Sequence, residues 1–246
     1  MTVEVQDLTK EYHDHRKGVV KAVNGVSFTC DQGEVFGLLG PNGAGKTSTL
    51  RIISTILKPS QGSVSVAGFD VVEKPDQVRR NLGFLSNDTK LYPRLTPREV
   101  VRLFGRLYDI PKDKLESRID ELMEVLDMKE FADVWCEKLS TGTQQKACIA
   151  RAVIHDPPVI ILDEPSSGLD VPTVRTVHNF IREYRNRGKC IVFSTHVMSE
   201  AQKMCDRIAV INQGKITASG SFIDLQEETG LADPEDLFIS LTQRES

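Results

Sequence analysis

Gly40-Pro-Asn-Gly-Ala-Gly-Lys46-Thr47 is the stretch of this sequence that decides the fold. Its glycines and its final lysine and threonine stand at the positions of a phosphate-binding loop (P-loop). Glycines let the backbone turn its N–H groups toward an anion, and the following helix adds the positive end of its dipole. Lysine supplies charge for the outer phosphates and threonine a hydroxyl for Mg²⁺. The loop predicts a nucleotide site formed by Gly40, Pro41, Asn42, Gly43, Ala44, Gly45, Lys46, Thr47 and Ser48.

The residues around this loop predict a strand before it and a helix after it. Residues 34–39 are a short apolar run typical of a buried strand, and Leu50, Ile53 and Leu57 recur at helical spacing. A chance glycine-rich turn is the alternative, but it would give the adjacent lysine and threonine no purpose. The order of strand, glycine loop and helix favours the P-loop.

The composition is that of an ordinary globular protein. The chain has 246 residues, of which 39% are hydrophobic and 27% are charged, enough for a substantial core. A net charge of −4 gives no basic excess, so nucleic acid is not expected as a partner. No stretch approaches the roughly 20 apolar residues of a membrane span, and the N-terminus lacks a signal-peptide pattern. Any link to a membrane is therefore expected to go through a partner. The five scattered cysteines, without a C-x-x-C pair, predict reduced and buried thiols.

Two blocks of different periodicity precede residue 155. Alternating residues predict short strands at 3–5, 23–29 and 63–68, with a polar loop at 13–18, which together indicate a small antiparallel sheet. A helical block follows, in which Thr96-Pro97-Arg98-Glu99 is a capping box. Pro111 separates it from a second apolar stripe formed by Leu115, Ile119, Leu122 and Leu126.

The second half returns to strands. A helix is expected at 147–154, and residues 159–162 and 190–193 are continuous apolar runs typical of parallel strands covered on both faces. A hairpin is expected from Arg207, and a helical tail from Asp224 with a break at Gly230. The predicted fold class is α/β: a P-loop core of mainly parallel sheet flanked by helices, with an N-terminal antiparallel β subdomain and an inserted α-helical subdomain.

Two carboxylates, Asp163 and Glu164, end the first of these apolar runs. Ligands of open α/β sheets bind at the carboxyl ends of the strands. We expect Asp163 to hold Mg²⁺ through water and Glu164 to orient and deprotonate an attacking water. A solvated acidic turn is the alternative, which the P-loop in the same chain disfavours.

His196 ends the second apolar run and is expected to reach the same crevice, where it would bond the γ-phosphate. A surface histidine that caps the helix near Ser199 is the alternative. The other histidines are expected to be surface residues of that kind: His13, His15, His155 and His178.

Taken in their order along the chain, the motifs of this sequence resemble those of the ATP-binding subunits of ABC transporters. Residues 139–146 stand where that family has its LSGGQ signature and the residues after it, and 166–170 resemble its D-loop. Residues 9–12 resemble the segment whose aromatic stacks on adenine, and 83–87 the loop that usually ends in glutamine. The resemblance implies one cassette over 1–246, with its core at 1–86 and 155–220, a helical subdomain at 87–154 and a C-terminal extension at 221–246.

The family's mechanism implies ATP and Mg²⁺ as cofactors and an ATP-dependent homodimer. Two cassettes would sandwich two ATP molecules, each P-loop facing the partner's signature. Catalysis would use Lys46, Glu164 and His196, and Mg²⁺ would meet Thr47, Asn87 and Asp163. The further nucleotide contacts implied are Tyr12, Asn87, Ser140, Thr141, Gly142, Thr143 and Asp170.

Three positions depart from the family pattern. Asn87 replaces glutamine and is one methylene shorter in its reach to Mg²⁺. The signature is LSTGT, so Thr141 places a β-branched side chain where glycine is common. The polar loop at 13–18 lengthens the path after Tyr12, whose alternative role is packing at a strand end.

The stretches 85–99 and 237–242 resemble the exporter branch, particularly its sodium-extruding members. That branch implies separate integral-membrane subunits that dock on residues 87–98, and a peripheral place on the cytoplasmic face of the cell membrane. Leu91, Tyr92, Pro93 and Leu95 would contact them, or would pack the subdomain. The implied activity is ATP hydrolysis coupled to export. Na⁺ is the cargo that this branch suggests; a drug, a lipid or another small molecule is the alternative.

Two other classes fit less well. ABC ATPases of DNA repair would place a long coiled coil between Thr47 and Leu139, and no sustained heptads lie there. Translation factors carry two cassettes in one chain. A pseudo-ATPase would lack catalytic residues that this sequence retains.

Overall fold

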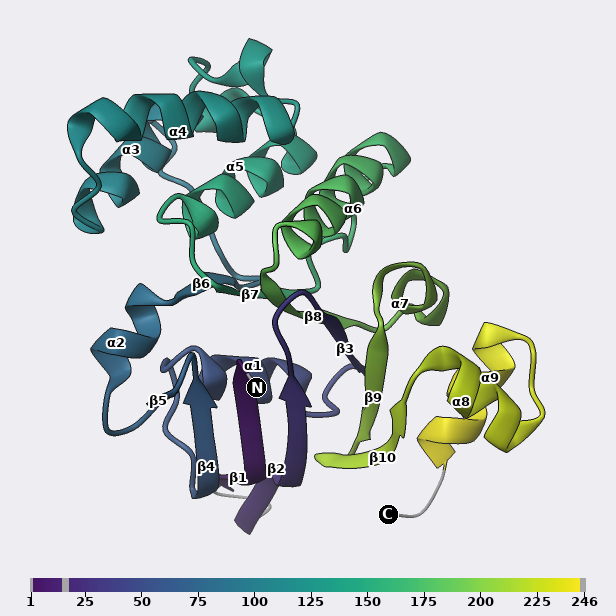
Figure 1. The fold of residues 1–246 in the computed structure, drawn as a ribbon. Helices are drawn as coiled ribbons and strands as arrows, with labels where there is room; N and C mark the ends of the chain where they lie inside the picture. The colour runs from purple at the N-terminus through teal and green to yellow at the C-terminus, as the bar shows by residue number, and fades with distance from the viewer. Residues whose placement is uncertain (1, 15–17, 244–246) are drawn as a thin grey trace.

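The computed structural model describes residues 2–14 and 18–243, and these form two sheets flanked by helices (Figure 1). The first sheet is four-stranded and antiparallel, in the order β2-β1-β4-β5. Its strands are β1 Val3–Asp14, β2 Gly18–Cys30, β4 Gln61–Val66 and β5 Phe69–Asp70. The predicted antiparallel sheet is therefore confirmed.

The polar loop predicted at 13–18 was too long. His13 pairs with Val19 and Asp14 with Gly18, so both strands continue into that range. Polar residues can continue these strands, because the backbone hydrogen bonds between the strands form in an exposed hairpin without apolar side chains. Residues 15–17, with His15, lie outside the described part of the chain.

The second sheet is the core and has the order β10-β9-β3-β8-β7-β6. Its strands are β3 Val35–Leu39, β6 Leu82–Leu85, β7 Val159–Asp163, β8 Cys190–Thr195, β9 Arg207–Asn212 and β10 Lys215–Gly220. All neighbours are parallel except β9 and β10, which form the predicted hairpin. Every residue of β3, β7 and β8 is buried, as predicted for strands covered on both faces.

Helices and the first sheet cover the two faces of the core sheet. The longer helices are α1 Lys46–Ile53, α3 Pro97–Leu107, α4 Lys112–Val125, α5 Thr141–Val153, α6 Val171–Asn186, α8 Phe222–Thr229 and α9 Pro234–Gln243. Shorter ones are α2 Pro75–Arg80, α7 Met198–Met204 and 3₁₀ turns at Lys129–Phe131 and Cys136–Lys138. Figure 1 shows α3, α4, α5 and α6 above the core sheet and the four-stranded sheet below it.

The side chains of β7 point alternately to the two faces of the core sheet and so pack into two different hydrophobic cores. Ile160 and Leu162 pack with α3 to α6, whereas Val159 and Ile161 pack with α1 and the four-stranded sheet. The helical block is confirmed: Thr96 forms its capping box with Glu99, and the stripe on α4 is buried.

Two helix boundaries differ from the predictions. Helix α1 ends at Ile53, because Thr55 adopts a left-handed conformation (φ 62°) and the N–H of Leu57 returns to Arg51 O. Helix α5 begins at Thr141, before the expected residue 147, because the Ser140 hydroxyl caps it. The tail has the predicted break, where Gly230 ends α8 with φ 71°.

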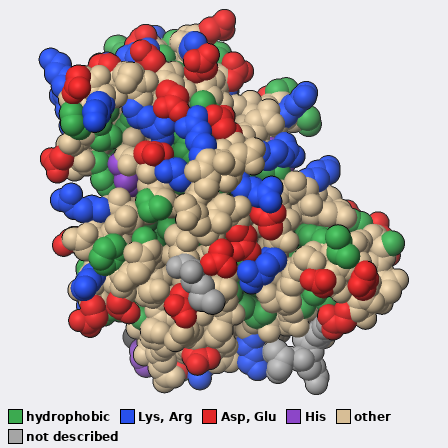
Figure 2. Space-filling view, viewed as in Figure 1, with side chains coloured by type: hydrophobic (Ala, Val, Ile, Leu, Met, Phe, Trp, Pro, Cys, Tyr) green, Lys and Arg blue, Asp and Glu red, His purple; other side chains and the backbone are tan. Residues whose placement is uncertain are grey.

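The surface and the thiols agree with an ordinary globular chain. Figure 2 shows acidic and basic side chains intermixed over the visible face. All five cysteines are free, and four of them are buried. Within residues 2–14 and 18–243, no helix has the length and apolar character to cross a bilayer.

Candidate functional site

The P-loop joins β3 to α1 and wraps a cavity of about 150 Å³ lined by residues 42–48, Ala22 and Glu164. Two of its glycines, Gly40 and Gly45, lie so close to neighbouring backbone that a side chain would clash. A Cβ on Gly40 would lie 2.2 Å from Ile211 O, and one on Gly45 would lie 2.3 Å from Ala22 O. Gly45 also has φ 111°, which disfavours any other residue. The loop therefore keeps its shape only with glycine at both positions.

The Lys46 side chain is buried inside this loop, with 4% of its surface exposed. Its ammonium donates to Gly40 O at 2.7 Å and to Pro41 O at 3.2 Å. It also lies 3.4 Å from Glu164 Oε1. A buried charge held this way is partly desolvated, so it interacts strongly with an arriving phosphate.

Asp163 ends β7 and is fully buried beside β8. Its Oδ1 accepts a hydrogen bond from Ser194 Oγ at 2.7 Å. Its Oδ2 has no hydrogen-bond partner among the residues that the structure describes. A buried carboxylate with one unsatisfied oxygen fits a hydrated Mg²⁺, which prefers oxygen ligands and keeps several waters. Thr47 stands at the mouth of the same loop.

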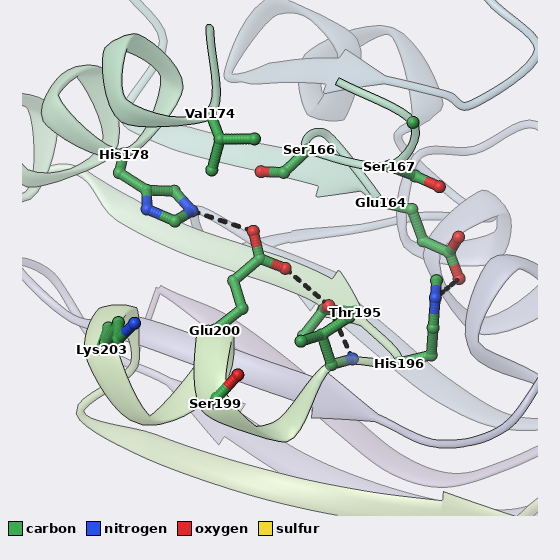
Figure 3. A pocket seen from close by; sticks show the side chains of 12 residues that line it. Glu164, Ser166, Ser167, Val174, His178, Thr195, His196, Ser199, Glu200 and Lys203 are labelled. Carbon is green, nitrogen blue, oxygen red and sulfur yellow. Dashed lines mark hydrogen bonds and ion pairs between the residues drawn. The ribbon is translucent and has the colours of Figure 1, made fainter. Parts of the chain in front are cut away.

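Glu164 adopts a backbone conformation that side chains rarely take, with φ 48°. Its N–H donates to Ser194 Oγ at 3.0 Å and to Ser194 O at 3.2 Å, which fixes the residue in that conformation. The side chain turns toward the P-loop, and its Oε1 lies 3.4 Å from His196 Nδ1 (Figure 3). Glu164 is thus held between Lys46 and His196.

A second cavity of about 340 Å³ adjoins Glu164 and His196 (Figure 3). It is bounded by the turn 166–168, by α6 and by α7. Glu200 of α7 lies here, and its two oxygens meet His178 Nε2 at 2.9 Å and Thr195 Oγ1 at 2.7 Å. Sequence analysis missed Glu200, because nothing in the sequence of α7 shows that this helix meets α6. The prediction of a surface histidine was wrong for His178, whose side chain is only 13% exposed because it pairs with Glu200.

His155 also departs from the predicted surface role. Its ring stacks on Tyr108, with 3.7 Å between centroids. Burial lowers the pKa of His155 to about 4. His13 is exposed, as predicted.

The signature-like residues lie at the start of α5. Ser140 Oγ accepts from Thr143 N at 3.2 Å and shares a hydrogen bond with Thr143 Oγ1 at 2.9 Å. Gly142 approaches α6 so closely that a Cβ would lie 2.7 Å from Thr173 Oγ1. Asp170 caps α6 by accepting from Thr173 N, and hydrogen bonds from the side chain and the backbone of Thr173 lower the pKa of Asp170. Thr141 is exposed.

The structure gathers some of the predicted site residues and separates others. Lys46, Glu164 and His196 meet at the carboxyl ends of β3, β7 and β8. Residues 140–143 do not line the P-loop cavity, nor do Asn87 and Tyr12. Asn87 is exposed just beyond β6, and Tyr12 is 40% exposed on β1, with Lys10 Nζ 5.4 Å from its ring.

The region 87–98 presents a mixed surface. Leu91 and Leu95 pack against the core of the helical block, whereas Tyr92 is 51% exposed. A cavity of about 470 Å³ lies between α2 and the end of α3, lined by Asp76, Gln77, Arg79, Arg80, Leu107 and Tyr108.

Known proteins share this arrangement. ABC transporter ATP-binding protein NatA of Bacillus subtilis (strain 168) is 39% identical over 239 residues, 97% of each chain. Nod factor export ATP-binding protein I of Neorhizobium galegae is 37% identical over 93% of this chain, which spans 64% of that longer protein. A solved structure of an ATP-binding subunit of an ABC transporter matches with a TM-score of 0.89 and 29% identity, covering 99% of this chain and 100% of that one.

A second solved structure is the dimeric bacterial ABC transporter cassette MJ0796, with a TM-score of 0.81 and 26% identity over 89% of this chain and 98% of that one. The family model described as ABC transporter matches residues 23–167, more than half of the chain. The resemblance drawn from the motifs and the predicted fold class are therefore confirmed, and the chain belongs to the ABC transporter family as an ATP-binding cassette.

Proposed function

We propose that this chain binds ATP at its P-loop, hydrolyses it with Glu164 as the base, and thereby powers export through separate membrane subunits. One observation carries the proposal: the buried Lys46 ammonium and the Glu164 carboxylate share one cavity, beside the unsatisfied oxygen of Asp163. A phosphate binder, a metal-binding carboxylate and a base are the groups that phosphoryl transfer to water requires.

Each group has a role that follows from its place. Loop N–H groups and Lys46 would hold the outer phosphates, and Lys46 would exchange its carbonyl partners for phosphate oxygens. Thr47 and Asp163 would hold Mg²⁺, with Asn87 reaching it from beyond β6; bound there, the ion supplies charge against the phosphates. Glu164 would accept the proton of the attacking water.

The contact between Lys46 and Glu164 would couple the phosphate binder to the base. The ammonium lies 3.4 Å from the carboxylate. A phosphate that draws Lys46 away would free Glu164 for water, with His196 remaining beside it at 3.4 Å. The base therefore becomes available when its substrate is present.

The partner copy is proposed because one chain does not complete the site. Residues 140–143 do not line the P-loop cavity, yet Ser140 and the start of α5 offer a hydroxyl and free backbone N–H groups suited to a phosphate. We propose that a second copy presents them, as in the dimeric cassette MJ0796. Asp170 would lie at the same interface, and Tyr12 would stack on adenine.

The membrane partner is proposed to dock on residues 87–98 and on the cavity of about 470 Å³ between α2 and the end of α3. The exposed Tyr92 and Leu107 offer apolar contact there, and Arg79 and Arg80 offer charge. This arrangement would hold the cassette at the cytoplasmic face of the cell membrane.

The proposed cargo is Na⁺, because the chain is similar to NatA. Another small molecule is the alternative cargo, because the chain is also similar to a Nod factor export protein. The helical subdomain is proposed to span 87–154.

The test is ATP hydrolysis by the full chain and by Lys46→Ala. Loss of one charge-stabilising donor should cost on the order of 3 kcal/mol, a fall in kcat/KM of roughly 10²-fold. Lys114→Ala, on the exposed face of α4, is the matched control and should keep the full rate. Unchanged hydrolysis by Lys46→Ala would overturn the proposal.

A further inference from the structure

A buried carboxylate that the proposed chemistry does not use lies behind His196. Glu200 of α7 has a side chain only 13% exposed, and both of its oxygens are bonded. Oε1 meets His178 Nε2 at 2.9 Å, and Oε2 accepts from Thr195 Oγ1 at 2.7 Å (Figure 3). Isolated burial of a carboxylate is costly, so two bonds of this quality indicate a site that is built rather than incidental.

The contact with Thr195 controls the backbone around His196. The Thr195 hydroxyl donates to Glu200 and accepts from the Val197 N–H at 3.1 Å. One hydroxyl thus ties together the residues on either side of His196. The His196 side chain is 42% exposed, so packing holds it weakly and its direction depends on this turn.

The charge of Glu200 strengthens this arrangement. Burial by itself would raise the pKa of Glu200, but hydrogen bonds from His178 and Thr195 outweigh burial and lower it. The group is therefore ionised at neutral pH. A hydrogen bond to an ionised acceptor is roughly twice as strong as a neutral one, so the Thr195 hydroxyl is held firmly.

The contact with His178 ties the same turn to α6. That helix begins after Asp170, and its first turn carries Thr173, which abuts Gly142 of the signature segment. The histidine lies further along α6 and faces Glu200 across the cavity in Figure 3. A single rigid helix therefore joins the signature segment to the turn that presents His196.

We infer that Glu200 is a positioning residue for ATP hydrolysis, which fixes through Thr195 the turn that presents His196 to Glu164. The inference rests on the proposed function, since it assigns a supporting group to that reaction. Glu200 itself touches neither Glu164 nor the P-loop cavity among the described contacts. Its effect should therefore fall on turnover and not on nucleotide affinity.

The test compares steady-state hydrolysis by full-length variants. Glu200→Ala should lower kcat roughly 10–100-fold, the usual range for loss of a supporting partner, with KM for ATP nearly unchanged. Glu200→Gln keeps an oxygen for the Thr195 hydroxyl and should retain most of the rate. Lys203→Ala is the matched control, because Lys203 lines the same cavity from the same helix and has no bonded partner in the described part of the chain.

A second pair keeps the inference testable if Glu200→Ala misfolds. Thr195→Val has the same shape without the hydroxyl and should lower kcat, whereas Thr195→Ser keeps the hydroxyl and should restore it. Equal rates for these two, or a wild-type kcat in folded Glu200→Ala, would overturn the inference. If either of those results is found and His196→Ala is inactive in the same assay, the proposed function stands and only the role of Glu200 fails. A wild-type chain without ATPase activity overturns both.

Discussion

The substitution Glu164→Gln separates nucleotide binding from hydrolysis. The amide has nearly the same shape as the carboxylate, so Lys46 and His196 keep a partner at the positions 3.4 Å away. It cannot accept a proton from water at neutral pH. Loss of a general base should therefore lower kcat by roughly 10²–10⁴-fold.

The same substitution should strengthen ATP binding. The Lys46 ammonium lies 3.4 Å from the Glu164 carboxylate and donates to two carbonyl oxygens. Exchanging the carboxylate for a neutral amide releases Lys46 more readily, and it removes a negative charge that would face the γ-phosphate. Charge-assisted bonds exceed neutral ones by roughly 1 kcal/mol, so affinity should rise about fivefold.

Size-exclusion chromatography with light scattering provides the assay. Glu164→Gln should be a monomer without nucleotide and a dimer with ATP, first without Mg²⁺ and then with it. Glu73→Gln, a carboxylate on the exposed surface, is the control and should turn over like the wild type. Full turnover by Glu164→Gln would refute the assignment of the base. A variant that binds ATP and never dimerises would show that membrane subunits must bring the cassettes together, or that Thr141 and Thr143 weaken the signature.

Three further predictions concern packing and stability. The His155 pKa is about 4, below the ordinary value near 6.5, so stability should be full above pH 6.5 and fall by up to roughly 3 kcal/mol toward pH 4. Urea unfolding of His155→Phe, which keeps the stack on Tyr108, should show a shallower pH dependence; an equal slope would contradict this. Gly142→Ala should cost about 1–3 kcal/mol by overpacking against Thr173, and the double variant with Thr173→Ala should recover it in the same assay. Thr96→Ala should cost about 1 kcal/mol through loss of the capping box, and thermal unfolding without any shift would count against it.

The features that sequence predicted are those with a local physical cause. The P-loop glycines are needed for local backbone shape and contact, and the apolar runs at β7 and β8 suit strands covered on both faces. The capping box at Thr96 is set by four consecutive residues. In each case the pattern that marks the feature lies within one segment, although some of its contacts, such as that of Gly40 with Ile211, reach other strands, so a single sequence suffices to find it.

The features that it missed depend on how segments meet. His178 lies 22 residues before Glu200, and nothing in either helix reveals that α6 and α7 approach there. The ring of His155 stacks on Tyr108, which comes from the end of α3. The early end of α1 needed a threonine in a left-handed conformation, which local propensity disfavours. Tertiary contacts decided the first two, and an unfavourable local conformation the third.

The end of β8 explains why the separate motifs act at one place. Ser194 donates to Asp163 Oδ1 and accepts from the N–H of Glu164, so one hydroxyl orients the Asp163 carboxylate and fixes the backbone of the residue that follows β7. That bond occupies Oδ1 of Asp163, and Oδ2 has no hydrogen-bond partner among the described residues. The next residue, Thr195, also uses its hydroxyl twice, toward Glu200 of α7 and toward the backbone N–H that follows His196. Two adjacent hydroxyl side chains on one buried strand thus position the proposed metal ligand, the backbone of the proposed base and the turn that carries His196, and this requires β7 and β8 to be neighbours in the sheet.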